Sequence, residues 1–150
     1  MRLLLLSLVL ITSSCVSTPR VNLNVFTVAV AGQQVLVGES ISFGGRGSFE
    51  LQSINGDPTT CTGRYTYRRL PKSKATFNCT NGNKGTVKLV AGEGMSGTGK
   101  GMSASGQVQI AFGFSLPELN RQITFPSNTE LVIVNNRYSL VPKDTSNDKS

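Results

Sequence analysis

The residue types that most often carry out catalysis are few and scattered in this chain. It contains eight acidic residues, three cysteines and no histidine. Without histidine, the Ser–His–Asp and Cys–His arrangements of nucleophilic catalysis are excluded. Hydrolysis by paired carboxylates needs two acids about 5–9 Å apart, and the acids here stand singly, outside any local motif. Ser103 near Lys100 is little evidence for Ser–Lys chemistry. We therefore expect a protein that is not an enzyme.

One glycine-rich segment resembles a phosphate-binding loop in part. Residues Gly94–Lys100 (GMSGTGK) fit the pattern G-x-x-x-x-G-K, in which backbone amides wrap phosphates and the lysine neutralises them. Gly101 follows, where a serine or threonine hydroxyl must hold magnesium, and the next residues alternate like a strand instead of starting a helix. We therefore predict a glycine-rich hairpin, with no nucleotide partner and no cofactor.

The first residues have the layout of an export signal. Met1-Arg2 is positively charged, Leu3–Ile11 is an apolar run, and Thr12–Ser14 is a region of small residues. The run is too short to cross a bilayer, which takes about 20 apolar residues. We predict a signal peptide over residues 1–14.

Cys15 directly follows the small residues, and Ile11–Cys15 resembles the lipobox of bacterial lipoprotein signals, from which it departs at Thr12. The resemblance implies that the Cys15 thiol receives a diacylglycerol, that the signal is cut before it, and that the new amino terminus is acylated. Val16 replaces the aspartate associated with inner-membrane retention, which implies the outer membrane, facing the periplasm. Residues 15–20 then form a lipidated tether that reaches at most about 20 Å.

With Cys15 lipidated, Cys61 and Cys79 remain as an even pair. An oxidising compartment outside the cytoplasm allows them to form a disulfide. Closing so short a loop stabilises the fold by about 3 kcal/mol. Two cysteines without histidine make a poor zinc site, so we predict a disulfide and no metal.

The composition favours strands over helices, because glycine, threonine, serine, valine and asparagine are frequent and charged residues make up only 15%. Short strand signals recur between turn clusters such as Asn55–Pro58, Asn81–Asn83, Gly92–Gly94 and Asn135-Asn136. We predict strands at 21–31, 35–37, 48–53, 61–68, 75–79, 86–90, 97–102, 107–114, 121–125, 131–134 and 137–141, and one helical turn at Pro117–Asn120. This indicates an all-β fold: a single antiparallel β-barrel or β-sandwich of about 8–10 short strands with one disulfide. The β-domain covers residues 21–141, and the polar tail 142–150 is expected to be disordered.

The formal net charge of +7 favours an anionic partner, or serves only to keep the domain soluble. The most basic stretch holds Arg64, Arg68, Arg69, Lys72 and Lys74, together with Tyr65 and Tyr67. Strand alternation places the tyrosines on the core side and Arg64, Thr66 and Arg68 on the other side. These five cations are our candidate site for an anionic envelope component. The alternative is a solvated face, and nucleic acid is not an expected partner.

Two further resemblances concern the second half of the chain. The segment Cys61–Gly113 looks like small, uncharacterised bacterial envelope proteins with two cysteines, a C-x-x-G-x-x-G turn at Cys79–Gly85 and a final aromatic-glycine strand, which implies a β-fold but no activity. Ser103-Ala104-Ser105-Gly106 is similar to the S-A-S-G segment of membrane-bound inhibitors of C-type lysozyme. That similarity implies that Ser103 and Ser105 approach the cleft of a lysozyme.

Together these features predict a lipid-anchored cell-envelope protein with a non-catalytic binding or structural role. Its expected partners are the membrane, through the N-terminal lipid, and a protein or anionic polymer of the envelope. The alternative is a membrane-bound inhibitor of lysozyme or another cell-wall hydrolase.

Overall fold

The computed structural model describes residues 23–43, 45–69 and 72–144. The predicted signal peptide, Cys15, the tether 15–20 and the tail from residue 145 onward lie outside the described residues.

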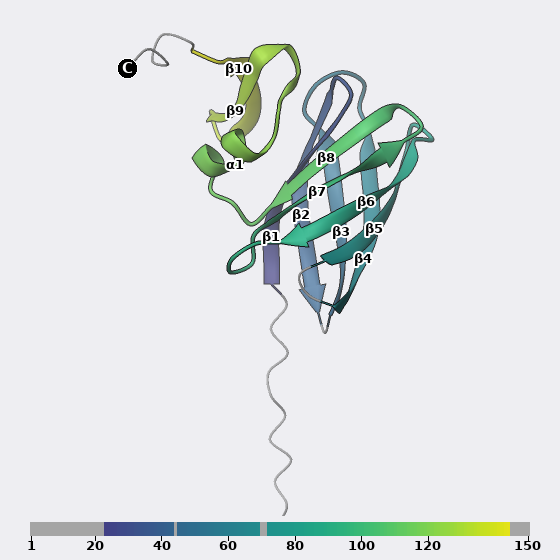
Figure 1. The fold of residues 1–150 in the computed structure, drawn as a ribbon. Helices are drawn as coiled ribbons and strands as arrows, with labels where there is room; N and C mark the ends of the chain where they lie inside the picture. Colours follow the sequence, from purple (N-terminus) through teal and green to yellow (C-terminus); the bar gives the residue numbers. More distant parts are fainter. Residues whose placement is uncertain (1–22, 44, 70–71, 145–150) are drawn as a thin grey trace, which may run out of the picture.

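Eight antiparallel strands form a closed barrel in chain order, because β8 pairs back with β1 (Figure 1). The strands are β1 (Leu23–Ala31), β2 (Gln34–Phe43), β3 (Arg46–Ser53), β4 (Thr60–Arg69), β5 (Lys72–Cys79), β6 (Lys84–Ala91), β7 (Gly97–Ser103) and β8 (Gly106–Phe112). The predicted all-β class is confirmed, and the two predicted architectures resolve to the barrel. Closure removes the free sheet edges that otherwise invite pairing with other chains.

The strands form where polar and apolar residues alternate. In β3 and β5 buried residues recur at every second position, as the sequence predicts for half-buried strands. The predicted turn clusters lie between strands. Gly82 has a φ of 82°, and Asn135 and Asn136 have φ values of 51° and 61°. Asparagine and glycine tolerate this left-handed conformation best, so these residue types make tight turns at little cost.

The barrel interior is filled by large side chains that lie beside glycines. Phe49 on β3 and Phe77 on β5 both pair with Gly63, which stands between them on β4. A Cβ atom on Gly63 would overlap the ring of Phe49. Alternating large and small residues in this way is how small barrels fill their interior. The buried cluster also contains Val25, Ala29, Leu36, Leu51, Cys61, Tyr65, Ala75, Val87, Leu89, Val108, Ile110 and Phe112.

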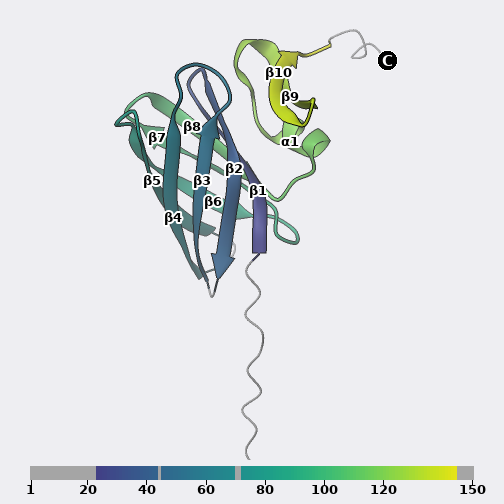
Figure 2. The ribbon, with the colours of Figure 1, turned by 180° about the vertical axis from the view of Figure 1, so that it is seen from behind.

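The C-terminal segment covers the outer face of β1 and β2 (Figures 1 and 2). It consists of helix α1 (Leu116–Gln122), the 3-10 turn η1 (Pro126–Asn128) and the hairpin of β9 (Thr129–Val134) and β10 (Arg137–Pro142). A second buried cluster joins the two parts: Val28, Val30, Val35, Val37, Ala111, Leu119, Ile123, Phe125 and Leu131. The hairpin also stacks the ring of Tyr138 on Phe26, with 5.0 Å between ring centroids.

The prediction of a strand at 121–125 is wrong, because Arg121 and Gln122 form the last turn of α1. The predicted helical turn at Pro117–Asn120 is confirmed as part of that helix. At its start, the hydroxyl and backbone N–H of Ser115 both donate to the Glu118 carboxylate, over 2.7 and 3.2 Å. These two hydrogen bonds lower the pKa of Glu118, so the cap weakens as pH falls through that lowered value.

Candidate functional site

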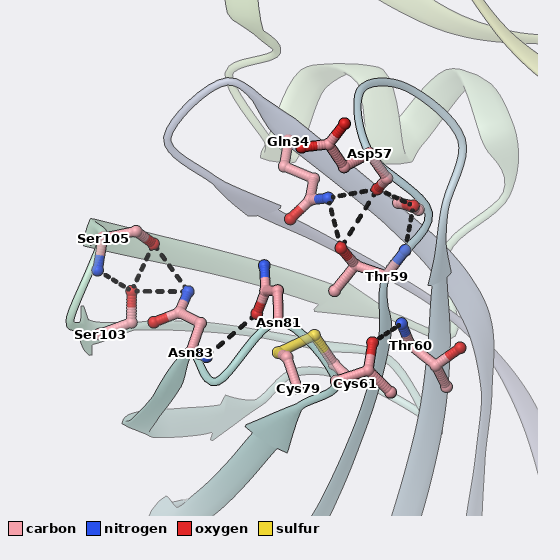
Figure 3. The surroundings of a disulfide bond; sticks show 12 residues. Gln34, Asp57, Thr59, Thr60, Cys61, Cys79, Asn81, Asn83, Ser103 and Ser105 are labelled. Carbon is pink, nitrogen blue, oxygen red and sulfur yellow. Dashed lines mark hydrogen bonds between the residues drawn. A yellow bond between two sulfur atoms is a disulfide. The ribbon is translucent and has the colours of Figure 1, made fainter.

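The disulfide lies at one end of the barrel (Figure 3). Cys61 on β4 and Cys79 on β5 are directly opposite each other, with their Cα atoms 4.0 Å apart. The predicted pairing is therefore confirmed. The bond links neighbouring strands and faces the interior, since Cys61 is buried within the main cluster. Its role in this position is to stabilise the barrel.

Ser103 and Ser105 lie near the disulfide, where the β7–β8 hairpin turns (Figure 3). The side-chain amide of Asn83 donates to the Ser105 hydroxyl over 2.7 Å, and the two serine hydroxyls are 3.0 Å apart. The Ser103 hydroxyl also donates to the carbonyl of Gly106 over 3.1 Å. The predicted inhibitor segment is thus held by hydrogen bonds within the chain.

The described part of the barrel has no room for a ligand inside. The cavity near the disulfide has a volume of about 20 Å³, and another beside Thr27 and Ser40 has about 10 Å³. A site for one water needs about 10–15 Å³, whereas pockets for small molecules measure about 300–1,000 Å³. The Asn83 Oδ1 atom is buried without a partner among the described residues, and Asn83 is one of the residues that line the larger cavity. Any binding by this barrel is therefore a matter for its outer surface.

The predicted basic stretch lies on β4 and β5. Arg64 and Tyr65 point to opposite faces of β4, as strand alternation predicts. Tyr65 is buried in the core, while Arg64, Lys72 and Lys74 are exposed on the outer face. The side chains of Arg68 and Arg69 lie outside the described residues. Arg64, Lys72 and Lys74 border an open surface hollow of about 580 Å³. Its other lining residues are Tyr65, Thr66, Ser73 and Thr76.

The structure adds two lysines that the linear stretch does not contain. Lys74 on β5 pairs with Lys88 on β6, and Lys88 pairs with Lys100 on β7. All three side chains are exposed. Neighbouring strands are about 4.8 Å apart, so the three ammonium groups share one band across the barrel wall. We call Lys74, Lys88 and Lys100 the lysine row.

None of these three lysines forms a salt bridge within residues 23–43, 45–69 and 72–144. Like charges directly opposite each other on adjacent strands destabilise a sheet. Repulsion within the lysine row therefore disfavours the fold, and no acid among the described residues neutralises its positive charge.

The charge of the whole chain is concentrated on these strands. Residues 60–112, which span β4 to β8, contain eight of the fifteen cations and a single acid, Glu93, for a net charge of +7. The other residues carry seven of each sign and cancel. Glu39 on β2 and Glu50 on β3 pair directly with each other, so the outer face is acidic there and basic over β4 to β7.

The described residues contain no group of three or more metal-ligating acids, cysteines or histidines. No helix among them is long and apolar enough to cross a membrane. Comparison with known proteins finds no matching family model, no matching curated protein and no matching solved structure.

Proposed function

We propose that this protein is a non-catalytic, lipid-anchored component of the cell envelope whose barrel binds an anionic polymer on its outer face. The lysine row carries the proposal. Three cations directly opposite one another, without acidic partners, disfavour the fold, and an anionic polymer along the row would neutralise all three at once.

The shape of the barrel fits this role. The interior cavities of the described residues are too small to hold a carried ligand, and a closed wall holds charged side chains at fixed spacing. A linear polyanion can follow a band of cations across several strands without any shaped pocket. The lysine row begins beside the open hollow lined by Arg64 and Lys72, which extends the basic surface toward β4.

The anchor in this proposal is a lipid on Cys15, attached after cleavage of residues 1–14. The Cys61–Cys79 disulfide supports export, because such bonds persist in oxidising compartments outside the cytoplasm. Several acyl chains at one site would hold the protein firmly, since each buried CH₂ contributes about 0.8 kcal/mol. The anchor and the basic wall together would keep the barrel beside an envelope polymer.

The test is the triple variant Lys74→Gln, Lys88→Gln, Lys100→Gln in residues 16–150, which contain both buried clusters and the disulfide in full. Each cation near an anionic surface contributes about 1 kcal/mol, so we expect roughly a hundredfold loss of affinity. The probe is inorganic polyphosphate, titrated at about 0.15 M salt and followed by calorimetry.

A variant with the same loss of charge serves as control: Arg121→Gln, Arg137→Gln, Lys143→Gln. These three cations are exposed on the C-terminal segment, away from the lysine row. We expect this control to keep its affinity within about threefold, because at about 0.15 M salt the Debye length is about 8 Å and charges far from the lysine row are screened. Equal losses in both triple variants would mean that net charge alone attracts the polymer, and the proposal would fail.

A further inference from the structure

The end of the barrel opposite the disulfide carries a group of exposed apolar side chains. Because the strands alternate in direction, β1, β3, β5 and β7 start there and β2, β4, β6 and β8 finish there (Figure 1). Ile41 and Phe43 lie at the finish of β2 and are each 43% exposed. Val90 at the finish of β6 is 45% exposed, and Met95 in the β6–β7 loop is 51% exposed. We call this end the apolar end.

These side chains stand on opposite sides of the rim. In a closed barrel of eight strands, three strands separate β2 from β6 in either direction. Ile41 and Phe43 therefore lie on the outer wall at one side of the apolar end, and Val90 lies on the outer wall at the opposite side, with Met95 in the loop that follows. A soft surface into which the apolar end sinks would contact both groups, so contact would hold the barrel upright on that surface.

Cations lie between the two apolar groups. Arg46 is the first residue of β3 and Lys72 the first of β5, and both side chains are exposed. Arg46 pairs with Phe43 and Lys72 pairs with Val90, so each apolar group has a cation directly beside it. Acids lie nearby as well: Glu93 and Glu118 border the same surface hollow as Val90 and Met95, and Glu39 lies beside Ile41 on the outer face. Apolar side chains flanked by cations are the combination that binds the interface of an anionic bilayer, where headgroup phosphates lie just above the acyl chains.

The start of β1 places the segment that leads to Cys15 at the same end of the barrel. β1 begins at Leu23, at the apolar end, so the segment that leads back to Cys15 joins the barrel there. Eight peptide steps separate Cys15 from Leu23 and span at most about 29 Å when fully extended. A lipid on Cys15 would therefore keep the apolar end within that distance of the bilayer. This step rests on the proposed function.

We propose that the apolar end docks on the anionic phospholipid surface of the membrane that holds the lipid. Ile41, Phe43, Val90 and Met95 enter the headgroup region, while Arg46 and Lys72 bind phosphates. The barrel then stands on the membrane, with the disulfide end pointing away and the lysine row facing sideways, where a polymer can reach it.

The experiment uses residues 16–150, which lack Cys15 and therefore report docking without any lipid. Binding to vesicles of phosphatidylglycerol and phosphatidylcholine is measured by flotation and compared with binding to pure phosphatidylcholine. We expect the unaltered segment to bind the anionic vesicles more strongly. The variant Ile41→Ser, Met95→Ser, which removes one apolar side chain from each side of the rim, should lower that affinity at least about tenfold.

The matched control is Ile133→Ser, Met102→Ser. It makes the same changes at exposed positions on β9 and at the disulfide end of β7. The control should bind within about twofold of the unaltered segment. Equal binding by both double variants, or no preference for anionic vesicles, would overturn the docking proposal.

Soluble polyphosphate separates the two proposals. The variant Ile41→Ser, Met95→Ser should bind it as the unaltered segment does, because the lysine row is intact. Suppose that the lysine triple variant loses polyphosphate binding, and that the variant Ile41→Ser, Met95→Ser binds vesicles as the unaltered segment does. These results would retain the proposed function and reject docking by the apolar end. If the lysine triple variant kept its polyphosphate binding and the variant Ile41→Ser, Met95→Ser lost its vesicle binding, polymer binding by the lysine row would be rejected. Docking by the apolar end would then be retained.

Discussion

Replacing Gly101 with alanine is expected to lower the free energy of unfolding by about 3 kcal/mol. Gly101 lies on β7, and a Cβ atom there would overlap the carbonyl oxygen of Thr86 on β6 and lie 2.7 Å from the Cα of Val87. Both obstacles are backbone atoms of a paired strand, so no side-chain rotation can relieve the overlap. The barrel wall would have to move, which a close-packed interior resists. Urea unfolding of residues 16–150, followed by circular dichroism, measures the loss.

Gly92→Ala is the matched control for that substitution. Gly92 lies in the exposed β6–β7 loop with a negative φ, and the nearest atom to its added Cβ would be the movable hydroxyl of Ser96, at 3.3 Å. The same chemical change there should alter stability by less than about 1 kcal/mol. If Gly101→Ala were as stable as Gly92→Ala, the tight approach of β6 and β7 in this structure would be incorrect.

Removing the disulfide is expected to cost about 3 kcal/mol, because it closes a loop with a sequence separation of 18 residues. The loss comes mainly from the greater freedom of the unfolded chain. The measurement compares the urea midpoint of residues 16–150 with that of Cys61→Ser, Cys79→Ser. Reductant should lower the midpoint of the unaltered segment to that of the variant and leave the variant unchanged. A midpoint that does not respond to reductant would show that the bond does not contribute to stability.

The strands could be predicted best where only one face of the sheet is buried. β3 and β5 alternate cleanly, and their predicted positions match to within a few residues. In β1 the apolar residues Phe26–Ala31 run on without alternation. The structure gives the reason: Thr27 and Ala29 face the interior, whereas Val28 and Val30 are covered by the C-terminal segment. The sequence signals such burial on both faces but does not say what covers the outer one.

The sequence contains a signal that argues against the wrongly predicted strand at 121–125. Ser115 and Glu118 have the spacing of a capping box, and Pro117 stands in the first turn, where proline suits a helix. Together they predict a helix that starts after Ser115 and continues past Asn120. The apolar residues Ile123 and Phe125 alternate like a strand, but they belong to the irregular segment after α1 that fills the second buried cluster.

Half of the candidate site could be predicted from the sequence. Arg64, Lys72 and Lys74 stand close together in the chain, and strand alternation correctly placed Arg64 on the outer face. Lys72 and Lys74 come before the strand predicted at 75–79, and the structure includes them in β5. Lys88 and Lys100 could not be assigned to the same site, because their meeting with Lys74 depends on the register between β5, β6 and β7. A shift of one residue would turn each of these side chains to the other face. Register depends on the closure of the whole barrel, which no local pattern contains.

The filled barrel has an acidic side over β2 and β3, a basic side over β4 to β7 and an apolar end beside the start of β1. The proposed lipid on Cys15 would hold the apolar end against the bilayer and present the basic side to the envelope.

The mass of the mature protein, purified with detergent from the cell envelope, tests this account most directly. We expect an N-terminal peptide that begins at Cys15 and carries a diacylglyceryl thioether and an amide-linked acyl chain, and a Cys15→Ser protein that lacks this lipid. An intact Met1 on a water-soluble cytosolic product, with Cys61 and Cys79 both reduced, would contradict the account.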